Sequence, residues 1–266
     1  MPGQLTKDQQ KCVNEMNKNG ERVNKAQLKE NEWCLQRFQS EKLGPQTTFD
    51  FDQCLTADVR DKVQKAKAKT RAQEEKKCES PLPAFGYTGA ATVNDAAMNA
   101  GLWMNYILFG GPPVSDGILA TNAQDSRDEA RCQLEMLKRA DKLENTVLKE
   151  LNKAKRQALK EESVDSSDAL RDELVRVFSS NRKIRKDEEM LADRVDKKCE
   201  SLAAPSTIFP GIPDSCGIPN PDWRQAEDCA IAAARCEACL KINAFDDLDL
   251  DCDAADDLSS NDSCGD

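Results

Sequence analysis

Two long segments of the chain, 6–80 and 126–201, begin with similar sequences and end with the same one, and each of these short sequences contains a cysteine. The segment TKDQQKCVNEM at 6–16 aligns with SRDEARCQLEM at 126–136, and the pentapeptide KKCES occurs at 76–80 and again at 197–201. The cysteines that these anchors carry are separated by 66 residues in one copy and 67 in the other. Two anchors at nearly the same offset predict an internal duplication, in which each copy is one supersecondary unit.

Each copy is predicted to form two long helices joined by a turn. We expect helices over 7–43 and 56–79 in the first copy, and over 127–162 and 168–202 in the second. Apolar residues recur at steps of three and four in the second pair, as on one face of a helix. The predicted helix starts carry capping-box pairs, namely Thr6 with Gln9, Ser126 with Glu129 and, further on, Asp222 with Gln225. Two such helices around a short turn give an antiparallel hairpin.

The hairpin geometry assigns partners to six of the twelve cysteines. In an antiparallel pair, a cysteine near the start of the first helix meets one near the end of the second, and cysteines that flank the turn meet each other. The predicted disulfides are therefore Cys12–Cys78, Cys34–Cys54 and Cys132–Cys199. The second copy lacks both cysteines of the turn pair, as expected if these two are partners.

The absence of histidine restricts the chemistry that the chain can perform. With twelve cysteines and no histidine, mixed Cys/His zinc sites and histidine-activated nucleophiles are excluded. A framework of disulfides is the default interpretation, and it indicates an oxidising compartment, secreted or at the cell surface. The first ten residues lack the apolar segment of a signal peptide, so we interpret Met1 as standing in place of a removed leader. No run approaches the roughly eighteen apolar residues of a membrane-spanning helix.

These patterns predict an all-α fold of two tandem, disulfide-stapled hairpins, each followed by a loop and a short helix. The chain is then divided into hairpin 1 at 5–80, a weakly charged linker at 81–126, hairpin 2 at 127–202 and an acidic, cysteine-rich segment at 203–266.

The linker stands apart because it contains no Lys or Arg and only three Asp. A short helix is predicted from about residue 94 to 109. One interpretation is a satellite core that packs on the hairpins. The other is a surface for self-assembly, because an aromatic, weakly charged segment on a protein with few aromatic residues needs a partner. The candidate assembly residues are Trp103, Tyr106, Ile107 and Phe109.

The last six cysteines are predicted to pair among themselves. Cys229, Cys236 and Cys239 share one face of a predicted helix, and we expect them to bond outward to the flanking segments that hold Cys216, Cys252 and Cys264. Six cysteines allow fifteen pairings, so the individual bonds stay open. Two alternatives are a CEAC redox pair at 236–239 and a four-thiolate zinc site at Cys229, Cys236, Cys239 and Cys252.

Acidity is concentrated at the C-terminal end of the chain. Residues 203–266 hold 3 Lys/Arg against 14 Asp/Glu, a net charge of −11, whereas the whole chain carries −10. Asp247, Asp249, Asp251 and Asp253 alternate along the sequence and offer the oxygen ligands that calcium prefers. The alternative is a solvated acidic terminus. No other cofactor is expected.

The [KR]-C helices, the K-C endings and the closing segment CAIAAARCEACLKINAFDDLDLDCDAADD resemble predicted secreted, cysteine-rich helical-repeat proteins of myxobacteria and related deltaproteobacteria. The resemblance covers most of the chain except 81–126. It implies export and disulfides, and supplies no activity.

The sequence therefore predicts a non-enzymatic extracellular structural protein that self-associates, into filaments or a surface layer. The alternative is an extracellular ligand-binding module, tuned by calcium through the acidic segment. Nucleic acid is not an expected partner, because the basic residues of the hairpins are interleaved with nearly as many acids.

Overall fold

The structure is a computed structural model that describes residues 3–40, 51–119, 126–256 and Cys264. Helices account for all the regular secondary structure in these ranges, which contain no strand. Their arrangement is an all-α fold braced by six disulfides.

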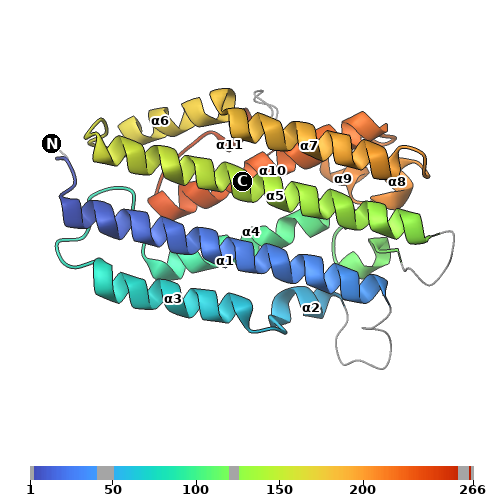
Figure 1. Cartoon of the computed structure of the whole chain (residues 1–266), viewed down its shortest axis with the longest axis horizontal. Coiled ribbons are helices and arrows are strands. Elements are labelled where there is room, and N and C mark those ends of the chain that lie inside the picture. The colour runs from blue at the N-terminus through green and yellow to red at the C-terminus, as the bar shows by residue number, and fades with distance from the viewer. Residues whose placement is uncertain (1–2, 41–50, 120–125, 257–263, 265–266) are drawn as a thin grey trace.

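The first helix pair consists of α1 (Lys7–Gln39) and α3 (Lys62–Lys77), with the short helix α2 (Phe51–Ala57) between them. The predicted capping box forms at the start of α1, where the Thr6 side chain accepts from the backbone of Gln9. Helices α1 and α3 lie side by side and run in opposite directions (Figure 1).

The predicted helix over 56–79 is interrupted between α2 and α3. Asp58 and Asp61 adopt positive φ angles of 46° and 55°, which no helix continues through. The Asp58 carboxylate accepts from the backbone N–H groups of Lys62, at 2.9 Å, and Gln64, at 2.7 Å. These bonds satisfy donors that the first turn of a helix leaves unpaired, so the break is stabilised locally.

The second helix pair consists of α5 (Arg127–Lys160) against α6 (Ser167–Ser180) and α7 (Arg182–Cys199). The sequence predicts one helix where α6 and α7 are separate. Asn181 lies at the break with extended backbone, and its side chain accepts from the backbone N–H of Lys183 at 2.8 Å. An asparagine in that position ends one helix and caps the next. The predicted capping box of Ser126 does not form, since its side chain makes no capping bond to α5.

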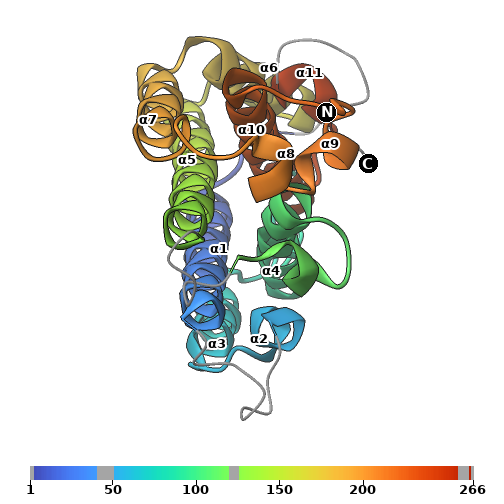
Figure 2. The same ribbon diagram turned by 90° about the vertical axis from the view of Figure 1, so that its right-hand side faces the viewer.

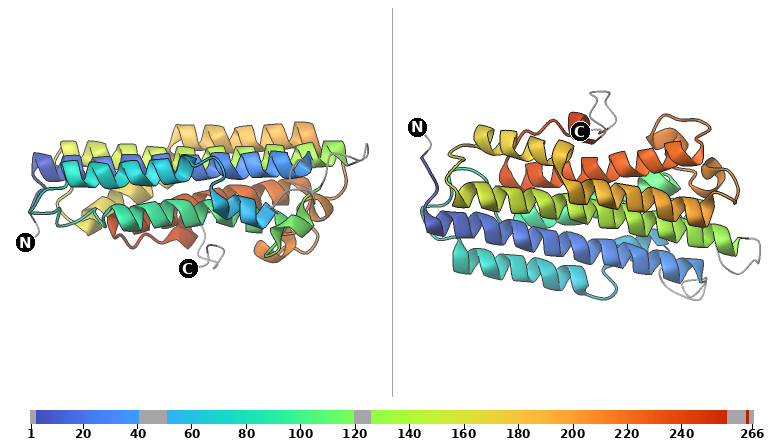
Figure 3. Two further views of the ribbon diagram at one scale, coloured as in Figure 1. Left: turned by 90° about the horizontal axis from the view of Figure 1, so that it is seen from below. Right: turned by 45° about the horizontal axis from the view of Figure 1, so that its top comes forward.

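Helices α3, α1, α5 and α7 lie side by side in one layer (Figure 1). A second layer contains α4 (Ala90–Phe109) and α10 (Trp223–Asp246), as Figures 2 and 3 show. The remaining short elements are η1 (Val114–Gly117), α8 (Pro205–Ile208), α9 (Ile212–Ser215) and α11 (Cys252–Asp256). The core lies between the two layers.

Close packing between the layers depends on a glycine in the middle of α1. A Cβ atom at Gly20 would lie 2.6 Å from a ring carbon of Phe245 in α10 and 2.7 Å from a methyl group of Val93 in α4. Only a residue without a side chain lets both helices approach α1 at this point.

The cross-links of the helix pairs are the three that the sequence predicts. Cys12–Cys78 and Cys34–Cys54 join α1 to α3 and to α2, with Cα–Cα distances of 4.8 and 5.9 Å. Cys132–Cys199 joins α5 to the end of α7, at 5.3 Å. Within the described ranges, every helix is too short or too polar to span a membrane.

Candidate functional site

The predicted assembly residues do not form one surface. Ile107 and Phe109 are buried, at 6% and 2% exposure, and Phe109 stacks on Phe209 with ring centroids 6.3 Å apart. Tyr106 is half-buried, while Trp103 is 45% exposed. The expectation of an apolar surface at these four positions is wrong. The apolar face of α4 packs against α1 and α10 of its own chain, so the satellite-core interpretation fits.

The four predicted calcium ligands lie on and beyond the end of α10. Asp247, Asp249 and Asp251 are exposed and Asp253 is half-buried, and Asp251 accepts from the backbone N–H of Ala254 at 2.9 Å. The described part of the chain contains no group of three or more Asp, Glu, Cys or His side chains placed to hold a metal ion. Calcium binding by these aspartates stays a prediction.

All twelve cysteines are paired, and the C-terminal six pair among themselves. The bonds run outward from α10 and are Cys216–Cys229, Cys236–Cys264 and Cys239–Cys252. The alternatives that used these residues as a CEAC redox pair or as zinc thiolates are therefore wrong, because no free thiol is left for either. Their role is to fasten the flanking segments to α10.

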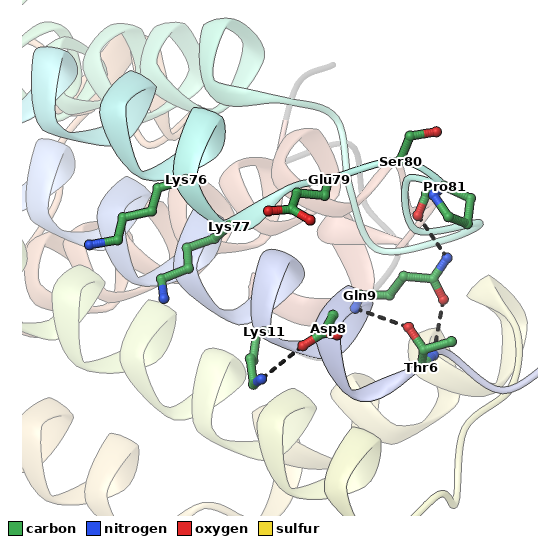
Figure 4. Close-up of a pocket in the computed structure, with 9 residues that line it drawn as sticks. All are labelled: Thr6, Asp8, Gln9, Lys11, Lys76, Lys77, Glu79, Ser80 and Pro81. Atoms are coloured by element: carbon green, nitrogen blue, oxygen red, sulfur yellow. Dashed lines mark hydrogen bonds and ion pairs between the residues drawn. The ribbon is translucent and has the colours of Figure 1, made fainter.

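The first KKCES copy lines a hollow of about 380 Å³ at the base of the α1–α3 pair (Figure 4). The Gln9 side chain donates to the carbonyl of Pro81 at 3.1 Å, and Lys11 pairs with Asp8 at 2.8 Å. Lys76 and Lys77 also line it, and both are exposed. The polar contacts of the hollow hold the segment after α3 against the start of α1. The residues that make these contacts therefore have a structural role.

A second hollow, of about 370 Å³, lies between α1 and α5. Its residues come from the middle of both helices, which face the viewer in Figure 1 with no element in front of them. The lining residues are Lys25, Leu28, Lys29, Glu32, Lys138, Arg139, Asp141, Lys142 and Asn145. Five of the nine are cations, and two carry carboxyl groups.

A smaller hollow of about 180 Å³ continues along the same pair of helices. It is lined by Asn14, Asn17, Lys18, Glu21, Lys149, Glu150, Asn152, Lys153, Arg156 and Lys183. It too has five cations and two carboxyl groups. We call the two hollows together the basic seam. On a chain with a net charge of −10, this concentration of positive charge is local and makes an electrostatic site for anions.

Several cations of the basic seam form no ion pair with a carboxylate in the described part of the chain. Six of the ten lie within ion-pair distance of a carboxylate, for example Lys29 with Glu32 at 2.6 Å and Lys142 with Asp187 at 2.6 Å. The other four make no ion pair within the described part of the chain, and these are Lys25, Lys138, Lys149 and Arg156. Two of them lie in each hollow, so both hollows retain positive charge for a ligand.

The floor of the larger hollow contains a buried carboxyl group. Asp141 is 2% exposed, and neither of its oxygens has a hydrogen-bond partner. Burial raises the pKa of Asp141 well above its ordinary value, and the neighbouring Glu144 and Glu32 raise it further. A buried acid among acids is held in its neutral form, because an ion there would be desolvated and repelled.

Two buried ion pairs join α5 to α10. Lys155 contacts both oxygens of Asp246 at 2.6 and 2.7 Å, and the Asn17 amide donates to the same carboxylate at 2.8 Å. Lys241 pairs with Glu144 and lies 3.6 Å from Glu237. The side chains of both pairs are fully buried.

Two further carboxyl groups lie near Lys241, and the whole group is close to electrically neutral. Burial raises the pKa of Glu237 to about 8, with Glu144 contributing in the same direction. With Glu237 and Asp141 protonated, Lys241 and Glu144 are left as a single neutralised pair. None of these buried charges was predicted from the sequence.

No family model, curated protein or solved structure matches the chain. The predicted resemblance to secreted cysteine-rich repeat proteins therefore stays a prediction.

Proposed function

We propose that the protein is a non-catalytic helical binding module of an oxidising compartment, and that its ligand is a linear polyanion bound along the basic seam. The observation that carries this proposal is the 370 Å³ hollow lined by five cations between α1 and α5. The six disulfides support an oxidising compartment. We therefore also propose that the protein is exported from the cell.

The length of the basic seam favours an extended ligand over a compact one. Lys138 and Arg156 are separated by eighteen positions of α5, which corresponds to roughly 27 Å along the helix axis. Neither hollow is lined by an aromatic side chain, so there is no platform on which nucleic-acid bases would stack. A polymer that carries carboxylate or sulfate groups at intervals fits this arrangement better.

The test uses heparin, a linear sulfated polyanion, as the probe in calorimetric titrations at low and high salt. The seam variant replaces Lys25, Lys138, Lys149 and Arg156 with alanine. The control variant replaces four exposed cations on α3 and α7, namely Lys69, Arg71, Arg185 and Lys186. Both lose the same charge, so only a site at the basic seam separates them.

We expect the seam variant to bind heparin at least tenfold more weakly than the control variant. We also expect the affinity of the wild type for heparin to fall as the salt concentration rises, because the release of counterions contributes to the binding of a polyanion. Equal loss in the two variants would show that binding is a general charge effect and would remove the proposal.

A second candidate function is self-association from head to tail. The exposed Asp247, Asp249 and Asp251 follow the end of α10, which belongs to the second layer, whereas α1 and α5, whose residues line the basic seam, belong to the first (Figure 2). Complementary charges on different faces produce open assemblies when the contact does not close on itself. The acidic segment of one copy is then the anion that the seam of the next copy binds.

Light scattering at low salt tests this candidate, with Asp247, Asp249 and Asp251 changed together to asparagine. Growth of the wild-type scattering with concentration, abolished in the asparagine variant, supports it. Strictly monomeric behaviour at low salt contradicts it and leaves the binding of an external polyanion as the function.

A further inference from the structure

Asp141 lies at the floor of the larger hollow of the basic seam without an internal partner. Its two oxygens are buried and make no hydrogen bond, although the same side chain lines a hollow in which five of the nine residues are cations. An unpartnered polar group in a buried position is unfavourable, by an amount comparable to a lost hydrogen bond. A ligand in the hollow would supply the missing partner.

The charges that face Asp141 come from three helices. Glu32 and Lys29 face it from α1, Glu144 from α5, and Lys241 from α10. The other charged groups of the hollow are Lys25, Lys138, Arg139 and Lys142. Burial and the two glutamates outweigh Lys29 and Lys241, so the pKa of Asp141 is raised. The carboxyl group therefore carries its proton under conditions in which an ordinary aspartate has lost it.

A protonated carboxyl group is a hydrogen-bond donor as well as an acceptor. On the lining of this largely cationic hollow, it can donate a hydrogen bond to an oxygen of a bound carboxylate or sulfate group, while Lys25 and Lys138 neutralise the charge of that group. An ionised Asp141 would instead repel the same group. The two protonation states of one residue thus have opposite effects on anion binding.

We propose that Asp141 acts as a neutral hydrogen-bond donor to an oxyanion bound in this hollow, and that the hollow releases the anion when a rise in pH ionises Asp141. This inference depends on the proposed function of the basic seam. It adds a specific subsite for a carboxylate or sulfate group and a pH-controlled release from it.

Inorganic sulfate is the probe, because its charge does not change between about pH 5 and pH 9, so that any pH dependence belongs to the protein. Binding is measured by calorimetry on the full-length wild type and on two variants. Asp141→Asn keeps a neutral donor of the same shape and cannot ionise. Asp141→Leu removes the donor. Circular dichroism and thermal unfolding check that each variant retains the fold.

The wild type should bind sulfate at least tenfold more weakly at pH 9 than at pH 5. Asp141→Asn should bind with little change across this range, at an affinity within about threefold of the wild type at pH 5. Asp141→Leu should bind about tenfold more weakly than the wild type at pH 5, as expected for loss of a hydrogen bond to a charged group. If Asp141→Leu does not fold, the comparison of the wild type with Asp141→Asn decides alone.

Parallel pH profiles for the wild type and Asp141→Asn would overturn the inference, because the titrating group would then lie elsewhere. If the seam variant loses sulfate binding while those two profiles stay parallel, the inference fails and the proposed function stands. If the wild type binds neither sulfate nor heparin at any pH, both fail.

Discussion

Replacing Glu237 with glutamine should make the protein more stable at neutral and alkaline pH and should flatten the dependence of its stability on pH. Glu237 is 2% exposed on α10, where its side chain lies 3.6 Å from Lys241. Burial raises its pKa from 4.5 to about 8, so the folded protein holds a proton that the unfolded chain gives up.

Proton linkage determines whether the free energy of unfolding rises or falls with pH. Between about pH 4.5 and pH 8 the folded state binds one more proton at this site than the unfolded state, so the free energy of unfolding falls as the pH rises. The slope is about 1.4 kcal/mol per pH unit, and over the 3.5 units between 4.5 and 8 the loss reaches about 5 kcal/mol. Glutamine cannot ionise in either state, so Glu237→Gln removes this loss.

Urea denaturation with intact disulfides, followed by circular dichroism, measures the free energy of unfolding at intervals from about pH 5 to pH 8. The wild-type slope should exceed that of Glu237→Gln by about 1 kcal/mol per unit. The variant keeps some slope of its own, because the pKa of Asp141 and of Asp246 is also raised by burial. Glu189→Gln, at an exposed position of α7, is the matched control. Parallel curves for the wild type and Glu237→Gln would refute the reasoning.

Three further perturbations address the contacts between helices. Lys155→Met leaves the fully buried Asp246 without its cation and should lower the free energy of unfolding by about 3–5 kcal/mol. The double variant Lys155→Met with Asp246→Leu should recover most of that loss in the same denaturation assay. Cys34→Ala with Cys54→Ala opens a disulfide that spans 20 residues and should cost about 3 kcal/mol, measured against the wild type under identical non-reducing conditions; a change below about 0.5 kcal/mol would contradict it. Gly20→Ala places a Cβ atom 2.6 Å from a phenyl ring and should destabilise the protein by about 2 kcal/mol, despite the better helix propensity of alanine, and an increase in melting temperature would contradict this.

The disulfides of the helix pairs could be predicted because covalent geometry and sequence spacing constrain each other. Cys12 lies near the start of α1 and Cys78 just after the end of α3, and these two positions meet when the two helices run antiparallel. The helix breaks were not predicted, although Asp58 and Asn181 are residue types that favour them. Each break depends on side-chain bonds to the following backbone, and acids and amides occur throughout these helices without ending them.

The buried charges were missed for a related reason. Lys155 lies on the apolar face of α5, four residues after Leu151 and three before Ala158, but a lone lysine at such a position usually extends its amine to solvent. Its burial depends on Asp246, which is separated from it by 91 residues. No local pattern joins the two, and the same is true of Lys241 and Glu144.

The prediction of an assembly surface assumed correctly that the weakly charged aromatic helix needs an apolar surface to cover it. It placed that surface on another copy of the chain. In the structure, α10 and α1 of the same chain pack against α4, while Phe109 stacks on Phe209. Which surface covers an apolar face is a tertiary property, and the repeated pattern of the hairpins carries no information about the helix between them.

The two ion pairs also explain how α10 keeps one position against α5. The buried face of α10 is rich in alanine and cysteine, and small side chains alone would let the helix slide with little loss of contact. Along α5 the acid Glu144 precedes the base Lys155, while along α10 the base Lys241 precedes the acid Asp246. Sliding α10 would leave buried charges without partners, which is far less favourable than the loss of a few apolar contacts. Because the same register places Lys241 near Asp141, the ion pairs that fix α10 also set the charge around the floor of the basic seam.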